Sequence, residues 1–264
     1  MIHALDRMVV STTSLQAAAA NYELPLGRHA ATPAGSGIPA RASIQLANVR
    51  LDLVAAPAGV ADGLSELGFA VADIGKAQRL LERRALSLRK GDEPVLHQVL
   101  HIAPEAAHGV SLSLVERAPG AGLAPPSALM GSEEAAAMAG LDHVVIRSPD
   151  PERAVAFYAG RLGLSLRLDR SEPAWGARLL FFRCGDLIVE VAHDLKAGIG
   201  DGPDRIWGLS WRAPDLAKAH ARLRAAGVEV SDLRAGRRPH TRVFTVKSHA
   251  AGVPTLVIGA APPP

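Results

Sequence analysis

Residues 141–163 read LDHVVIRSPDPERAVAFYAGRLG, and this stretch decides the fold. Its apolar opening predicts a β-strand, and Asp150 before Pro151 predicts the start of a helix. Gly163 predicts the left-handed turn that ends such a helix. Three short strands are expected to follow, over 165–171, 177–184 and 187–192. The stretch therefore opens a module of one strand, one helix and three strands (βαβββ).

The same pattern recurs along the chain. Residues 5–27, LDRMVVSTTSLQAAAANYELPLG, align with 141–163 without a gap, so that Tyr22 falls on Tyr158. Residues 68–81 and 210–223 form a second aligned pair, with matching Asp and Lys-Ala positions. Such internal repeats indicate a chain built from copies of one supersecondary unit. Four modules are expected, over 1–57, 63–117, 139–194 and 204–260.

A Pro- and Gly-rich segment separates the second module from the third. It reads APGAGLAPPSALMGSEEAAAM over residues 118–138 and begins without apolar periodicity, as linkers do. We therefore expect an α+β protein with two tandem domains, each made of two modules around a curved mixed sheet. The expected boundaries are 1–117 for the N-terminal domain, 118–138 for the linker and 139–264 for the C-terminal domain.

Composition excludes several classes of protein. With 48% hydrophobic and 21% charged residues, the 264-residue chain is neither disordered nor fibrous. It has no apolar run of about 18 residues that could cross a membrane, and its first residues contain no signal-peptide core. The single cysteine, Cys184, excludes internal disulfides and Cys-rich zinc sites. We expect a soluble cytoplasmic protein.

The net charge of +3 and the pI of about 9.3 do not by themselves indicate nucleic-acid binding. Basic residues are scattered and interleaved with acids, whereas a nucleic-acid protein concentrates them in a patch or stripe. The densest cluster is Arg234, Arg237, Arg238 and Arg242. Ala-rich composition with far more Arg than Lys is typical of a GC-rich, bacterial genome. We therefore expect neither a nucleic-acid nor a membrane partner.

Paired modules that open with LDHVVI and close with LIVEV (187–191) resemble the vicinal oxygen chelate superfamily. That superfamily includes glyoxalase I, extradiol ring-cleaving dioxygenases, methylmalonyl-CoA epimerase and the bleomycin-resistance binding proteins. The resemblance covers nearly the whole chain and is strongest over 139–194. It implies that two modules form an eight-stranded, cup-shaped sheet around a divalent metal. The ligands would come from the first and last strands of each module.

In the third module, the family's ligand positions hold His143 and Glu190. His143, Val145 and Arg147 share one face of a strand, because side chains alternate. An imidazole and a carboxylate suit a divalent ion such as Fe, Mn, Ni, Co or Zn. The corresponding positions of the other modules are Arg7 and Asp52 in the first, Glu66 and Ser113 in the second, and Gly208 and Leu256 in the fourth. The C-terminal domain thus offers two protein ligands where family enzymes keep three or four, and the N-terminal site looks degenerate. A protein without bound metal remains an alternative.

The resemblance implies a metal-dependent lyase or isomerase that acts on a small, oxygen-rich substrate, with Glu190 also as the catalytic residue. The alternative is a metal-independent protein that binds or sequesters a small molecule, as bleomycin-resistance proteins do. Ring cleavage by iron is disfavoured because it needs a second His. A homodimer is compatible with either reading. Substrate-binding candidates are Arg147, Arg183, Arg212 and His240.

Structural interpretations compete with these assignments. Glu190 lies in an apolar run, where a metal, a salt bridge to Arg183 or a protonated carboxyl group would each lower the cost of burial. His143 could be hydrogen-bonded in a polar cup. His97 and His101 share a strand face, but they are about 13 Å apart along the strand and therefore too far apart for one metal. Core packing is expected for Phe69, Trp207, Trp211, Tyr22, Tyr158 and Cys184.

Overall fold

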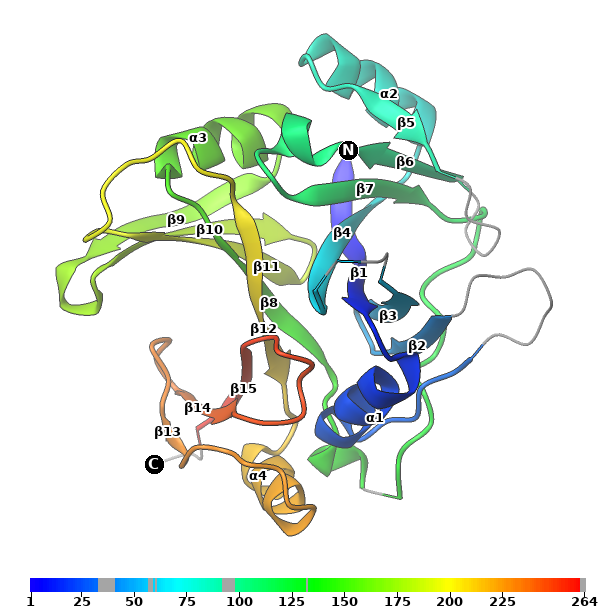
Figure 1. The fold of residues 1–264 in the computed structure, drawn as a ribbon, viewed down its shortest axis with the longest axis vertical. Coiled ribbons are helices and arrows are strands. Elements are labelled where there is room, and N and C mark those ends of the chain that lie inside the picture. The colour runs from blue at the N-terminus through cyan, green and yellow to red at the C-terminus, as the bar shows by residue number, and fades with distance from the viewer. Residues whose placement is uncertain (33–40, 57–58, 60, 92–97, 132, 262–264) are drawn as a thin grey trace. The chain divides into compact units, whose positions relative to one another are not determined.

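The computed structural model describes residues 1–32, 41–56, 59, 61–91, 98–131 and 133–261. Its elements follow the expected modules (Figure 1). The first module contains β1 (Ile2–Thr12), α1 (Leu15–Leu26), β2 (Arg41–Gln45) and β3 (Arg50–Ala55). The second contains β4 (Gly63–Val71), α2 (Ile74–Arg83), β5 (Leu88–Lys90), β6 (Gln98–Ile102) and β7 (Ser111–Glu116).

The two C-terminal modules repeat this order of elements. The third contains β8 (Gly140–Arg147), α3 (Pro151–Val155), a π-helical continuation (Ala156–Arg161), β9 (Ser165–Glu172), β10 (Ala177–Cys184) and β11 (Leu187–Asp194). The fourth contains β12 (Arg205–Arg212), α4 (Leu216–Ala225), β13 (Arg234–Ala235), β14 (Thr241–Val246) and β15 (Thr255–Ala260). The three strands expected after the third helix are thus confirmed.

Local sequence explains where the helices begin and end. The carboxylate of Asp150 accepts hydrogen bonds from the backbone N–H groups of Glu152 and Arg153, which caps α3. Asp73 and Asp215 cap α2 and α4 in the same way. Gly163, with φ of 77°, adopts the left-handed conformation expected after the third helix.

The strands form two mixed sheets. Their orders are β2-β3-β1-β4-β7-β6-β5 and β13-β14-β15-β12-β8-β11-β10-β9. The first sheet therefore uses the first two modules, and the second sheet uses the last two. In three modules the first strand lies parallel to the last, as β4 with β7, β8 with β11 and β12 with β15. The α+β class with paired βαβββ modules is confirmed, although the described part of the first module has three strands rather than four.

By internal contacts the chain divides into two compact units, each described here by itself. The first unit comprises 1–8, 65–122 and 143–207, and the second comprises 9–64, 123–142 and 208–264. The domain boundaries expected from the sequence stay a prediction. None of the helices in the described ranges is long and apolar enough to span a membrane.

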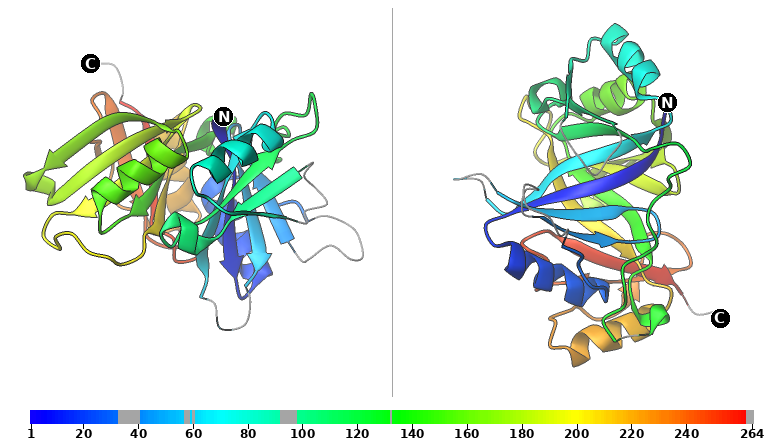
Figure 2. Two further views of the ribbon diagram at one scale, coloured as in Figure 1. Left: turned by 90° about the horizontal axis from the view of Figure 1, so that it is seen from above. Right: turned by 90° about the vertical axis from the view of Figure 1, so that its right-hand side faces the viewer.

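The first unit contains part of each of the two sheets. Its core lies between its helices and one face of each part. Helix α3 packs against β10 and β11 (Figure 2), and the ring of Tyr158 lies 5.5 Å from that of Phe182. Tyr158 and Phe69 are fully buried, as predicted. Trp207 is not: 41% of it is exposed, so its predicted core role is wrong. It lies near the beginning of β12, where the residues are more exposed than in the second half of the strand.

The second unit has its own helix-covered core. Helix α1 packs against β2 and β3, and α4 packs against β14 and β15. Tyr22 on α1 and Trp211 on β12 are buried, as predicted. Both units therefore keep one sheet face under helices, and functional side chains have to emerge on the other face.

Candidate functional site

His143 and Glu190 come together on neighbouring strands of the first unit. Strands β8 and β11 are parallel, with His143 opposite Ile188 and Val145 opposite Glu190. This register places both side chains on one face, and the imidazole Nε2 lies 3.7 Å from the Glu190 Oε2. Their side chains are 19% and 12% exposed. The arrangement is an imidazole and a carboxylate that solvent can reach but that most of their surroundings shield.

Burial along β11 explains why a carboxylate lies within an apolar run. Val189 and Val191 are fully buried, whereas Ile188, Glu190 and Ala192 on the opposite face are half-buried. Phe182 and Val189 share the face that α3 covers. Glu190 therefore points away from the helix-covered core, and alternation along the strand lets it do so without breaking the hydrophobic run.

Two substrate-binding candidates belong to the same unit as this His–Glu pair. Arg147 ends β8 on the face of His143, and its guanidinium carbon lies 4.3 Å from the centre of the Trp207 ring. Arg183 is exposed, and its Nε donates to the carbonyl oxygen of Gly185. Arg183 therefore does not form the salt bridge to Glu190 that the sequence left open.

The other two candidates belong to the second unit. Arg212 ends β12, with its Nε 4.0 Å from the Asp142 carboxylate, and Arg238 also approaches that carboxylate at 3.2 Å. His240 is exposed in the turn before β14, with a left-handed φ of 58°. Arg212 and His240 thus both lie in the second unit, and their role in substrate binding stays a prediction.

The corresponding positions of the first sheet hold a different cluster, which we call the Arg7 cluster (Arg7, Glu66, His101 and Ser113). Arg7 Nη2 donates to the Glu66 carboxylate at 3.0 Å, and Ser113 Oγ donates to the same oxygen at 2.6 Å. His101 Nδ1 lies 3.3 Å from the other oxygen. Arg7 is 1% exposed. A guanidinium thus occupies the region where the family resemblance places a metal.

The electrostatics of Glu66 follow from these contacts. Burial alone would raise its pKa, but the hydrogen bond from His101, the charge of Arg7 and the hydrogen bond from Ser113 outweigh burial and lower the pKa to about 2. Glu66 is therefore ionised throughout the physiological range. Its negative charge is balanced inside the protein, which leaves little attraction for an added cation.

Gly68 makes room for the Arg7 side chain. Gly68 lies opposite Ser113 across β4 and β7, and a Cβ there would meet Arg7 Cγ at 2.7 Å and Ser113 Oγ at 3.1 Å. Asp52, the first module's other ligand position, is buried and accepts from Arg50 Nη2 at 2.7 Å. Both acidic ligand positions of the first sheet are therefore paired with arginines.

Sequence reasoning missed the role of His101. It weighed this residue only with His97, which lies outside the described residues. The register of β6 and β7 places His101 opposite Ser113, which brings it to Glu66. No local sequence signal gives that register, because it depends on pairing between strands distant in the chain.

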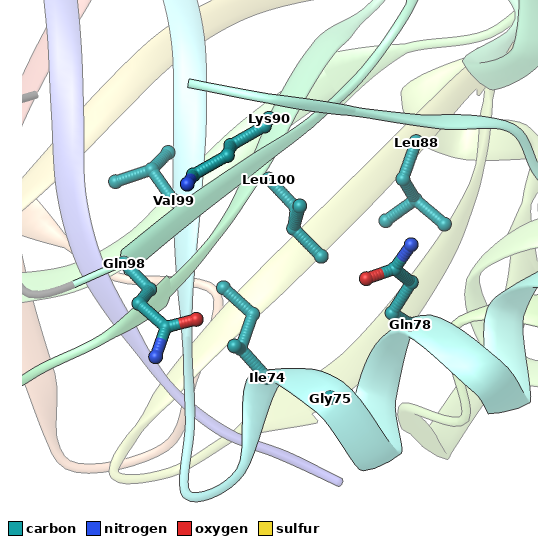
Figure 3. Close-up of a pocket in the computed structure, with 8 residues that line it drawn as sticks. All are labelled: Ile74, Gly75, Gln78, Leu88, Lys90, Gln98, Val99 and Leu100. Carbon is teal, nitrogen blue, oxygen red and sulfur yellow. The ribbon is translucent and has the colours of Figure 1, made fainter. Parts of the chain in front are cut away.

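A pocket elsewhere in the first unit has different chemistry. It lies between α2 and strands β5 and β6 (Figure 3), and its polar lining side chains are Gln78, Lys90 and Gln98. The rest of the lining is Ile74, Gly75, Leu88, Val99 and Leu100. It has no imidazole or carboxylate, so its lining offers none of the donors that a metal-dependent reaction needs.

The donor set of His143 and Glu190 partly fits a divalent metal. Two atoms bonded to one zinc-sized ion at about 2.1 Å lie roughly 3–3.5 Å apart, and the observed separation is 3.7 Å. Across the part of the chain that the structure describes, no group of three or more His, Cys, Asp or Glu side chains could hold an ion. The protein would therefore supply two ligands, and water or substrate oxygens would supply the others.

Comparison with known proteins assigns the family. A profile of the glyoxalase/bleomycin resistance protein/dioxygenase superfamily matches residues 142–245, from within β8 to within β14. The ethylmalonyl-CoA/methylmalonyl-CoA epimerase of Cereibacter sphaeroides is 30% identical over 97 residues, or 34% of this chain and 72% of the epimerase. The chain belongs to this superfamily. The resemblance to vicinal oxygen chelate proteins expected from the sequence is confirmed.

Solved structures of the superfamily share the fold over nearly the whole chain. The 2,2',3-trihydroxybiphenyl 1,2-dioxygenase of Sphingomonas wittichii has a TM-score of 0.72 at 19% identity, covering 98% of this chain and 91% of its own. The Mn(II)-bound glyoxalase of Novosphingobium aromaticivorans has a TM-score of 0.71 at 13% identity, covering 98% and 82%. Because the superfamily includes a dioxygenase, a glyoxalase and an epimerase, membership alone does not select the reaction.

Proposed function

We propose that this superfamily member is a divalent-metal-dependent lyase or isomerase that acts on a small substrate with neighbouring oxygens. His143 and Glu190 would hold the ion, and the substrate oxygens would complete its coordination. The observation that carries the proposal is the 3.7 Å approach of His143 Nε2 to Glu190 Oε2 on the open sheet face. The only support from relatives for the type of reaction is the epimerase similarity, because the solved structures share the fold alone.

The chain's own residues would act as follows. A bound divalent ion supplies Lewis acidity, which polarises a substrate carbonyl. The Glu190 carboxylate has two oxygens, so one can face the ion while the other accepts a proton from the substrate carbon beside that carbonyl. Returning the proton to a different face or atom makes the reaction an isomerisation. His143 fixes the position of the reacting oxygens from the neighbouring strand, because strand backbones hold side chains more rigidly than loops do.

The arrangement also predicts how metal would bind. With two protein ligands, affinity for the ion alone should be modest, and a chelating substrate should raise it, since each ligand binds more tightly once the other is in place. A metal that dissociates easily from the purified protein is therefore expected. Any measurement of metal content should follow reconstitution.

The test is metal content by elemental mass spectrometry after reconstitution with Mn, Fe, Ni, Co or Zn in turn. We expect about one equivalent of at least one ion in the native chain and less than about a tenth of that in His143→Ala and in Glu190→Ala, since each removes one of two ligands. His29→Ala is the matched control, because His29 Nδ1 lies 3.8 Å from Glu23 in the second unit. Equal metal content in all four proteins would refute the assignment.

A second candidate function is metal-independent binding of a small molecule. Two observations favour it: the fourth module's ligand positions hold Gly208 and Leu256, which have no donor side chains, and the described residues contain no group of three ligands. The two functions separate in a thermal-stability screen with a chelator present. A ligand at 100 times its Kd stabilises the fold by about 2.7 kcal/mol. Stabilisation that survives chelation favours binding without metal, and stabilisation that needs the ion favours the metal-dependent enzyme.

A further inference from the structure

Arg147 differs from the other arginines that surround the third module. Arg153 is paired with Asp204, and Arg178 is paired with Asp169 and Glu152. By contrast, no carboxylate within the described residues pairs with Arg147, and its recorded contact is with an aromatic ring. An arginine that is held in place but not neutralised keeps its full charge and its planar set of donors for a ligand.

Trp207 holds this guanidinium at the end of β8. The Arg147 carbon lies 4.3 Å from the ring centre, within the range of a cation–π contact. Stacking on a ring leaves the edge of the guanidinium, where its N–H groups point, open to an oxyanion. Trp207 is 41% exposed, which is unusual for a large aromatic side chain and is explained if a ligand covers it.

The position of Arg147 connects it with the His–Glu pair. Arg147 and His143 share one face of β8, four residues apart, which is about 13 Å along a strand. Arg147 lies opposite Ala192 on β11, two residues beyond Glu190 on the same face. Because Ala192 is small, no bulky side chain from β11 stands between Arg147 and the His–Glu pair.

We propose that Arg147, stacked on Trp207, is the anion subsite of the substrate that His143 and Glu190 act on. The substrate would carry a phosphate or a carboxylate on the order of 10 Å from its reacting oxygens, because of the strand spacing. The anion is therefore a remote handle rather than part of the reacting group. This inference rests on the proposed function of the His–Glu pair, but its test is independent of metal.

The experiment measures anion binding to the full chain by tryptophan fluorescence at low ionic strength, with pyrophosphate and succinate as separate probes. Saturable quenching by one of them is expected, and that probe identifies the oxyanion as phosphate-like or carboxylate-like. Arg147→Gln should weaken binding about tenfold or more, as loss of a charged hydrogen-bond donor does. Arg147→Lys should recover only part of it, because an ammonium neither stacks nor binds two oxygens as a guanidinium does.

Arg167→Gln is the matched control, because Arg167 is an exposed arginine on β9 of the same unit and its loss changes the net charge equally. It should leave binding unchanged. Because Trp207→Leu removes both the stack and a fluorophore, its affinity is read by calorimetry, where it should fall severalfold. Equal weakening by Arg147→Gln and Arg167→Gln would reveal diffuse surface charge, and no saturable binding of either probe would also overturn the inference.

The two proposals fail separately. If metal is bound through His143 and Glu190 but anion binding does not depend on Arg147, the assignment of the anion subsite is wrong and the proposed function stands. If Arg147→Gln abolishes anion binding and no ion is ever retained, the subsite is right and the metal assignment is wrong. Metal content of Arg147→Gln should equal that of the native chain, because Arg147 is not among the proposed ligands.

Discussion

The Arg7 cluster of the first sheet and the His143–Glu190 pair of the second share one repeat position, at which Arg7 matches His143, and they differ in the side chains that gather around it. In the first sheet a buried arginine, a serine and a histidine surround one carboxylate and supply its hydrogen bonds and counter-charge. In the second sheet an imidazole and a carboxylate approach each other at 3.7 Å, with burial similar to that of Glu66. Arg7 stands where its repeat counterpart is His143, and Glu66 stands where its counterpart is Gly208, so the first sheet has a guanidinium–carboxylate pair where the second has an imidazole and no side chain.

The comparison shows how a repeated fold can divide its tasks. An arginine supplies permanently the positive charge that a metal would supply reversibly, so the first sheet has a fixed ion pair at this place. Gly68 allows this by leaving space for Arg7, whereas Ser210 stands at the matching position of the repeat. We infer that the first sheet acts as the structural half of the protein.

The largest expected effect is on the stability of the Arg7 cluster. Arg7→Met should destabilise the fold by about 3–5 kcal/mol, because it leaves the Glu66 carboxylate without its main counter-charge in a buried setting. His143→Ala should cost about 1 kcal/mol or less, because the 3.7 Å between Nε2 and Oε2 is longer than a hydrogen bond. Urea denaturation of both variants measures the difference. Similar losses in the two variants would mean that both sites are structural.

The second largest effect on stability is expected from acid, which should act through Glu66 of the same cluster. The pKa of Glu66 is about 2 in the folded chain against an ordinary value of 4.5. The stability that ionised Glu66 contributes is therefore complete above about pH 4.5 and is lost as the pH falls toward 2, by about 3 kcal/mol in total. Unfolding measured as a function of pH should show this loss in the native chain. Glu66→Gln should lack that component, and an unchanged acid profile in this variant would contradict the assignment.

A smaller effect is expected at the glycine that admits Arg7. Gly68→Ala should destabilise by about 1–3 kcal/mol, because the new Cβ would press on the Arg7 and Ser113 side chains. Gly160→Ala is the control, since a Cβ at Gly160 meets nothing within 4 Å, and it should be neutral or slightly stabilising. Thermal denaturation distinguishes the two. Equal behaviour would show that Arg7 can move aside without cost.

Much of the fold was predictable from the sequence because its signals are local. Asp150 and Gly163 mark the limits of one helix, and the alternation of LIVEV indicates a strand with one covered face. Repetition of these signals identified four modules and the superfamily. Trp207 was misassigned for the opposite reason: alternation gives it the same face as Trp211, but burial along β12 differs between the two ends of the strand, and no local pattern gives that difference.

The candidate site was predictable as a pair of residues but not as a set of contacts. His143 and Glu190 follow from the module pattern, and parallel pairing of β8 and β11 brings them together. The stacking of Arg147 on Trp207 and the approach of His101 to Glu66 depend on which strands become neighbours and in which register. Register is fixed by burial summed over whole strands, so no short motif contains it.

The sequence by itself thus determined the modules, the helix limits and the residue types at each ligand position, because caps, turns and strand alternation act over a few residues. The tertiary structure alone decided which of those side chains come within ion-pairing or hydrogen-bonding distance of one another. That decision depends on distances between side chains from remote segments, and electrostatic balance changes steeply with such distances inside a protein. Arg7, His101 and Ser113 meet around the Glu66 carboxylate for this reason, and His143 meets Glu190 across β8 and β11.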